Sequence, residues 1–266
     1  MTQTEALAGV HPPPASAPLL RLEKVSKRFG AVQALTEVDF EVHAGEVVAL
    51  VGDNGAGKST LTKTMAGTLI PDEGRIVFDG RPVKLHGPAD ASDLGIATVY
   101  QDLALCDNLD VVANLYLGRE PVGRTAALDE LEMETSSMEL LERLSIKIPS
   151  VRTPVASLSG GQRQSIAVVR AAMGDPRVVL LDEPTAALGV AQTAQVLDLI
   201  HALRDQGLAQ VVISHSLNDV FAVSDRIIVL RLGRRVATFQ TADATTEAVV
   251  SAITGADVQL PHEEAP

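Results

Sequence analysis

Apolar residues along this chain follow two periods, one typical of strands and one typical of helices. Alternation predicts strands at 20–25 and 37–42, and the β-branched run EVVALV at 46–51 predicts a buried strand. That run breaks into GDNGAGKST, and the helical segment LTKTMAGTL follows at 61–69. A strand, a glycine-rich loop and a helix form the first unit of a doubly wound α/β fold.

The second half of the chain repeats the alternation of buried strands and helices. Helical spacing predicts helices at 128–146 and 161–173, the first of them rich in acidic residues. VVLLD at 178–182 and VVIS at 211–214 predict two buried strands, with a helix at 191–206 between them. A crossover of this length is what two parallel neighbours need.

Two short turns predict antiparallel hairpins beside this parallel core. RIVFDGRPVKL at 75–85 carries an Asp-Gly pair between apolar stretches, a two-residue hairpin signal that indicates a side sheet. A Leu-Gly pair joins IIVL at 227–230 to RVATF at 235–239, which predicts a terminal hairpin.

The domain organisation follows from where these patterns stop. Residues 1–18 end in HPPPASAP without periodicity and are expected to be a disordered tail. We expect one α/β domain at 19–242, with a helical subdomain at approximately 104–172, and a C-terminal tail at 243–266. No internal repeat is visible, so the sequence predicts a single module.

Composition narrows the functional classes. Hydrophobic residues make up 46% of the chain and aromatic residues only 3%, as expected for a core of aliphatic parallel strands. The single cysteine, Cys106, suggests a reducing compartment. The chain shows neither a signal-peptide pattern nor an apolar run long enough for a membrane span, so we expect a soluble, cytoplasmic protein. The net charge of −12 argues against nucleic acid as a partner.

The glycine-rich loop fits GxxxxGK[ST], the P-loop pattern. Glycines let the backbone wrap a phosphate chain, and the N-terminus of the following helix faces the anion. Lys58 is expected to reach the β- and γ-phosphates, and the Ser59 hydroxyl is expected to bind Mg²⁺. A plain glycine turn is the alternative, and the flanking strand and helix count against it. The expected nucleotide contacts are Gly52, Asp53, Asn54, Gly55, Ala56, Gly57, Lys58, Ser59 and Thr60.

The strand VVLLDE at 178–183 ends in two carboxylates. At the C-terminal edge of a parallel sheet, beside a P-loop, Asp182 is expected to hold the Mg²⁺ shell and Glu183 to polarise the attacking water. The alternative is a strand that ends in solvated acids, which is common for such a pattern alone.

A specific resemblance begins at residues 158–162. The run Leu-Ser-Gly-Gly-Gln matches the LSGGQ signature of ABC-type ATPases, and the resemblance covers roughly residues 20–240. It implies a P-loop NTPase with a RecA-like parallel-sheet core, an antiparallel β side sheet and a helical subdomain, and it implies ATP and Mg²⁺ as cofactors. In that family the signature helix addresses the γ-phosphate held by the other subunit of a head-to-tail dimer. The residues carried over are Ser159, Gly160, Gly161 and Gln162.

Three further positions match the same family. Gln101, in ATVYQ, is similar to the glutamine that contacts Mg²⁺ or water and links the core to the helical subdomain. His215, in VVISHS, is similar to the switch histidine that contacts the γ-phosphate. Phe29, in KRFG, is similar to the aromatic residue that stacks on adenine. The resemblance therefore makes Glu183, His215 and Gln101 the catalytic candidates.

One loop departs from the usual family pattern. After Asp182 the family carries a SALD-like loop, whereas this chain reads AALG, and Gly189 stands at the aspartate position. The altered loop, together with GDNGAGKSTL, TVYQDLAL and NLYLGRE, resembles the monosaccharide importers of the ribose, xylose and fructose type, in a single-domain form. An exporter subunit or another non-sugar transporter is the alternative, and a soluble nucleic-acid-associated ABC protein is a more distant one.

The resemblance also implies the partners. They are a second copy or a second ABC ATPase subunit, transmembrane permease subunits at the inner face of the cell membrane and, indirectly, a sugar-binding protein. The stretch 101–120 mixes apolar residues with few charges, where the family receives the permease. Ordinary packing of the helical subdomain is the alternative for this stretch.

Overall fold

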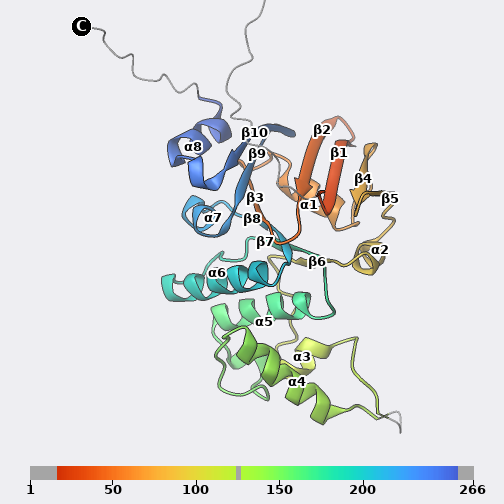
Figure 1. Ribbon diagram of the computed structural model, residues 1–266, viewed down its shortest axis with the longest axis vertical. Helices are drawn as coiled ribbons and strands as arrows, with labels where there is room; N and C mark the ends of the chain where they lie inside the picture. Colours follow the sequence, from red (N-terminus) through yellow and green to blue (C-terminus); the bar gives the residue numbers. More distant parts are fainter. Residues whose placement is uncertain (1–16, 124–126, 257–266) are drawn as a thin grey trace, which may run out of the picture.

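The computed structural model describes residues 17–123 and 127–256, which form two sheets with helices around them (Figure 1). Figure 1 shows the smaller sheet at the same end of the molecule as one edge of the larger sheet, and helices α3 (Val111–Tyr116) and α4 (Glu130–Arg143) at the other end. The expected tail at 1–18 lies almost entirely outside the described residues. Within the described residues, no helix combines the length and apolar composition of a membrane span.

The larger sheet is the predicted parallel core. Its strands have the order β10-β9-β3-β8-β7-β6, and every neighbouring pair is parallel except β10 and β9. All residues of β3 and β8 are buried, as strands covered on both faces require. The strands are β3 (Val47–Val51), β6 (Ile96–Val99), β7 (Val178–Asp182), β8 (Ala209–Ile213), β9 (Arg226–Arg231) and β10 (Arg234–Gln240).

The smaller sheet is the predicted antiparallel side sheet, with the order β2-β1-β4-β5. The Asp-Gly hairpin is confirmed, because Asp79 and Gly80 have φ values of 51° and 73°, as a tight two-residue turn needs. The strands are β1 (Leu20–Phe29), β2 (Val32–Val42), β4 (Glu73–Phe78) and β5 (Arg81–Val83).

Helices cover both faces of the core sheet. Val178 and Leu180 of β7 pack into one apolar cluster with Leu61, whereas Val179 and Leu181 pack into another with Ile166. Because Leu61 belongs to α1 and Ile166 to α5, these two helices lie on opposite faces of the sheet. The α-helices are α1 (Lys58–Met65), α2 (Pro88–Asp93), α3 (Val111–Tyr116), α4 (Glu130–Arg143), α5 (Gly160–Ala172), α6 (Val190–Asp205), α7 (Leu217–Val223) and α8 (Thr246–Thr254).

The expected C-terminal tail at 243–266 is corrected for Thr246–Thr254, which form α8. Thr245 caps this helix by accepting a hydrogen bond from the Ala248 amide at 3.2 Å. Val249 is fully buried in a third apolar cluster with residues of β3 and β9. This segment therefore has a packed core position, and only residues 257–266 lie outside the described structure.

Candidate functional site

The P-loop connects β3 to α1 and depends on its glycines. Gly52 has φ +151°, and a Cβ there would collide with the Leu230 carbonyl oxygen. Gly57 has φ +104°, and a Cβ there would lie 2.8 Å from the Ala34 carbonyl oxygen. A side chain at either position would push the backbone apart. Because both residues are glycines, the loop can keep the tight curve that lets amides approach an anion.

The donors around this curve fit a triphosphate. The Lys58 ammonium lies across the loop and donates to the carbonyl oxygens of Gly52 at 2.6 Å and Asp53 at 3.1 Å. Ser59 is exposed and Thr60 half-buried in the first turn of α1, whose N-terminal amides have no partner within the helix. An ammonium, a hydroxyl and a helix N-terminus are the groups that bind phosphate chains.

The turn between β9 and β10 is hydrogen-bonded to the P-loop. The Gly233 amide donates to the Ala56 carbonyl at 3.0 Å, and the Thr36 amide donates to the Gly233 carbonyl at 2.8 Å. Gly233 has φ +73°, and a Cβ there would lie 2.7 Å from the Ala34 carbonyl oxygen. From the sequence, Gly233 was predicted only as part of a hairpin turn, because no local pattern reveals a contact with such a distant loop.

Two carboxylates follow the buried part of β7. Burial raises the pKa of the half-buried Asp182 carboxyl above its ordinary value, the neighbouring Glu183 raises it further, and Lys58 acts in the opposite direction. A carboxylate whose charge is only partly compensated in this way suits a divalent cation, which favours the ionised form. The oxygen ligands of Mg²⁺ are of this kind.

Glu183 and His215 contact each other directly. Their atoms Oε2 and Nδ1 lie 2.8 Å apart, with the Glu183 side chain 17% exposed and the His215 side chain 74% exposed. The neighbouring parallel strands β7 and β8 pair Asp182 with Ile213, so their C-terminal ends bring the two residues together. Glu183 has φ +52°, a left-handed backbone conformation that differs from the extended conformation of the strand before it.

Gln101 and Phe29 are both exposed, on different sheets of the molecule. Gln101 is exposed just beyond β6, the strand beside β7, so it follows the same C-terminal edge as Glu183. Phe29 ends β1 with half of its surface exposed, and the Lys27 ammonium lies 5.9 Å from its ring centroid. An exposed ring of this kind is free to stack on a flat ligand.

The signature residues start α5, on the other face of the core sheet from α1. The Ser159 hydroxyl accepts from the Gln162 amide at 3.3 Å, and Gln162 Oε1 accepts from the Ser159 amide at 3.0 Å. This reciprocal cap fixes the first turn of the helix. A Cβ at Gly161 would lie 2.7 Å from Gln192 Cβ, so the signature packs closely against α6.

The AALG loop ends at the start of α6. Gly189 precedes this helix, and its amide donates to Gln192 Oε1 at 3.3 Å, so the first turn of the helix is capped although Gly189 has no side chain. The next residue, Val190, is 91% exposed. A cavity of about 400 Å³ borders this loop, and it is lined in part by Glu183, Leu188 and His215.

The stretch 101–120 is tied to α5 by two arginines. Arg170 of α5 donates to the carbonyls of Leu103 at 2.9 Å and Ala104 at 2.7 Å. Arg119 donates to the Met173 carbonyl at 2.8 Å and to the Arg170 carbonyl at 3.1 Å. Both arginines line a groove of about 550 Å³ between the core sheet and the helices. Burial lowers the pKa of Arg170, and the charge of Arg119 lowers it further.

Comparison with known proteins identifies several import ATP-binding proteins as relatives. One relative is a fructose import ATP-binding protein FrcA of Rhizobium meliloti, 43% identical over 91% of this chain and 96% of its own length. Another is a xylose/arabinose import ATP-binding protein XylG of Sulfolobus acidocaldarius, 47% identical over 81% of this chain and 86% of its own length. A ribose import ATP-binding protein RbsA 2 of Streptomyces avermitilis is 40% identical, and this chain spans 48% of its length.

The solved structures that are similar to this chain are also ATP-binding cassettes. The ATP-binding cassette MJ1267 of an ABC transporter superposes with a TM-score of 0.77 at 27% identity, over 89% of this chain and 99% of that chain. A dimeric cassette, MJ0796 bound to ADP and Pi, has a TM-score of 0.70 at 26% identity, over 84% of this chain and 98% of that chain. The family model described as "ABC transporter" matches residues 35–186. The chain is therefore an ATP-binding, ATP-hydrolysing member of the ABC transporter family.

Proposed function

We propose that this protein energises the import of simple sugars, as the ATPase subunit of a transporter with membrane permeases. The observation that carries the proposal is the gathering of Lys58, Asp182, Glu183 and His215 around one edge of the core sheet, with the signature helix packed on a different face from α1. The names of three relatives supply the cargo class of fructose, xylose or arabinose, and ribose. Export, or transport of another cargo, is the alternative.

Each residue at the edge has a separate task in ATP turnover. The P-loop amides and Lys58 hold the phosphates, while Ser59, Asp182 and Gln101 hold Mg²⁺. Mg²⁺ supplies positive charge to the phosphate oxygens. Glu183 orients a water and accepts its proton, as its position beside His215 allows.

The site becomes complete only with a second ATPase subunit, either another copy of this chain or a related one. The N-terminal amides of α5, held by the Ser159–Gln162 cap, address the γ-phosphate bound to the partner's P-loop. This head-to-tail arrangement is supported by the dimeric form of one similar cassette.

The proposed cargo is tested by uptake into vesicles. The chain is reconstituted with a candidate permease and a candidate sugar-binding protein, and ATP is enclosed on the side of the ATPase. Labelled fructose, xylose or ribose should enter only with hydrolysable ATP. Uptake of an unrelated solute without any of these sugars would overturn the sugar assignment and leave the ATPase assignment intact.

Docking of the permease is expected on the stretch 101–120, at the groove lined by Arg119 and Arg170, on the cytoplasmic face of the membrane. Single cysteines at exposed positions such as Leu117 should crosslink to a co-purified permease, and a cysteine at exposed Val236 of β10 serves as the matched control. Cys106 is first replaced by Ala. Crosslinks at Val236 without any in 101–120 would contradict this placement.

Phe29 is expected to carry the adenine. Replacing Phe29 with Ala should raise the Kd for ATP at least about fivefold, because stacking of a base on an aromatic ring contributes roughly 1–3 kcal/mol. Phe29→Tyr keeps a ring and should bind ATP as the parent does. The measurement is an equilibrium titration with ATP, and equal affinity of the Ala and Tyr variants would contradict the stacking role.

A further inference from the structure

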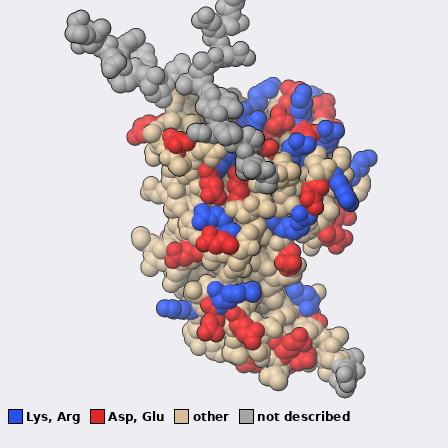
Figure 2. Space-filling view, in the orientation of Figure 1, with Lys and Arg blue, Asp and Glu red and all other residues tan. Residues whose placement is uncertain are grey.

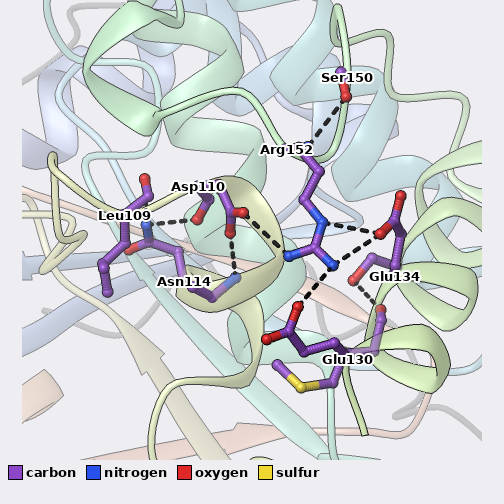
Figure 3. A network of polar contacts seen from close by, with 10 residues as sticks. Leu109, Asp110, Asn114, Glu130, Glu134, Ser150 and Arg152 are labelled. Atoms are coloured by element: carbon purple, nitrogen blue, oxygen red, sulfur yellow. Dashed lines mark hydrogen bonds and ion pairs between the residues drawn. The ribbon is translucent and has the colours of Figure 1, made fainter. Parts of the chain in front are cut away.

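Three carboxylates converge on Arg152, a short distance before the signature (Figure 3). The Arg152 guanidinium lies 3.4 Å from Asp110 Oδ2 and 3.4 Å from Glu130 Oε2. It lies closer to Glu134 Oε2, at 2.8 Å. Asp110 caps α3, while Glu130 and Glu134 belong to α4. One side chain therefore connects two helices with the segment that leads into α5.

The backbone of this segment, residues 150–157, pairs with residues 107–112. The Val155 amide donates to the Leu109 carbonyl at 3.0 Å, and two amides of 107–112 donate back at 3.2 Å each. Residues 107–112 follow shortly after Gln101. The loop after Gln101 and the approach to the signature are thus already joined by main-chain hydrogen bonds.

A buried asparagine makes the first half of this connection rigid. Asn114 has no exposed surface, and its Oδ1 accepts from the Cys106 amide at 2.7 Å. Its Nδ2 donates to the carbonyls of Cys106, Leu109 and Asp110 at 3.0–3.3 Å. Four polar contacts of a buried side chain hold the loop after Gln101 firmly on α3.

Arg152 also connects this segment to α4, which takes no part in the backbone pairing. Glu130 and Glu134 are four residues apart on α4, so both side chains lie on the same helix face and reach the guanidinium. Figure 2 shows acidic side chains gathered at the α3–α4 end of the molecule. Without Arg152, three carboxylates of like charge would face each other there and repel.

We infer that Arg152 is a positioning residue for ATP turnover. It holds α3, α4 and the segment 150–157 as one body, so that a displacement of the loop after Gln101 is carried to Ser159 at the start of α5. The inference rests on the proposed head-to-tail dimer, in which Ser159 acts on the nucleotide of the other subunit. Arg152 touches neither the P-loop nor the carboxylates of β7 in its own chain.

This role has a consequence that plain stabilisation of the fold would not have. Loss of Arg152 in one subunit should weaken the nucleotide site whose P-loop belongs to the other subunit. A variant that merely destabilised its own chain would instead weaken nucleotide binding by that chain.

The experiment uses two full copies joined by a flexible linker. Both carry Glu183→Gln, so that nucleotide is not consumed, and one copy carries Lys58→Ala, which leaves a single intact P-loop. Arg152→Ala is placed either in the Lys58→Ala copy or in the copy with the intact P-loop. A fluorescent ATP analogue then reports the affinity of the one remaining site.

The two arrangements contain the same substitutions and differ only in their placement. With both changes in one copy, affinity should fall roughly 2- to 30-fold, the range that coupling residues typically give. With the changes in different copies, affinity should match that of the linked dimer without Arg152→Ala. Equal affinity in the two arrangements would overturn the inference.

Two controls separate the possible failures. Ser159→Arg in the same two arrangements must show the asymmetry, because it blocks the contact itself. If Ser159→Arg shows none, the head-to-tail site of the proposed function fails; if only Arg152→Ala shows none, the positioning role alone fails. Adding Glu130→Gln and Glu134→Gln to Arg152→Ala should restore part of the affinity, since the repulsion is removed.

Discussion

Replacing Glu183 with Gln is expected to slow ATP hydrolysis about 10²–10⁴-fold, the usual effect of losing a general base. Gln keeps the size of the side chain and a hydrogen bond to His215, but it does not accept a proton from water. The proposed contacts of Lys58 and Ser59 with the nucleotide, and of Asp182 with Mg²⁺, should remain. Phosphate release under saturating Mg-ATP measures the effect, and near-normal turnover would contradict the assignment of the base.

The same variant should accumulate ATP between two subunits. Glu183→Gln with Mg-ATP is expected to form a dimer visible by light scattering, because in the proposed dimer the nucleotide bridges one P-loop and the other chain's signature. Adding Ser159→Arg places a bulky cation at that contact and should return the protein to monomer while ATP binding by single chains persists. A dimer that ignores Ser159→Arg would mean that the chains meet through another face.

Replacing Lys58 with Ala should abolish measurable ATP binding and turnover. The ammonium lies against two carbonyls of the P-loop, at 2.6 and 3.1 Å, where a phosphate chain would receive its charge. Truncation leaves this cradle without a cation, and the negative phosphates meet carbonyl oxygens without compensation.

The matched control for this loss is Lys84→Ala, since Lys84 is an exposed lysine outside the P-loop. Lys84→Ala should bind and hydrolyse ATP as the parent does. Wild-type ATP affinity of Lys58→Ala, measured by titration, would remove the P-loop assignment.

Within the core sheet, the central strands, which are buried on both faces, were predicted directly from their residues. EVVALV, VVLLD and VVIS become β3, β7 and β8, because continuous β-branched runs are distinctive when helices cover both sides. The edge strand β6 was not predicted, since it has only four residues and two of them are half-buried. Helix α8 was not predicted either, because its packing against β9 is a tertiary effect that leaves no strong local pattern.

The candidate site divides in the same way. Lys58 and Asp182 were predicted from local motifs, because phosphate binding and cation binding need those residues at fixed places in a strand–loop–helix unit. The assignment of His215 and Gln101 required the family resemblance. The contact of Glu183 with His215 exists because β7 and β8 are neighbours in the sheet. The residues of one strand do not reveal which strand lies beside it, so this contact could not be predicted from the sequence.

The turn at Gly233 lies far from the P-loop in sequence, yet we expect it to tolerate substitution as poorly as the P-loop does. Its amide holds the Ala56 carbonyl, and its backbone conformation and close approach to Ala34 exclude larger residues. In a saturation-mutagenesis screen scored by growth on the transported sugar, substitutions at 233 would therefore fall into the same class as substitutions in the P-loop. A reader of variant data who relied on the motif alone would mistake such a change for a harmless surface variant.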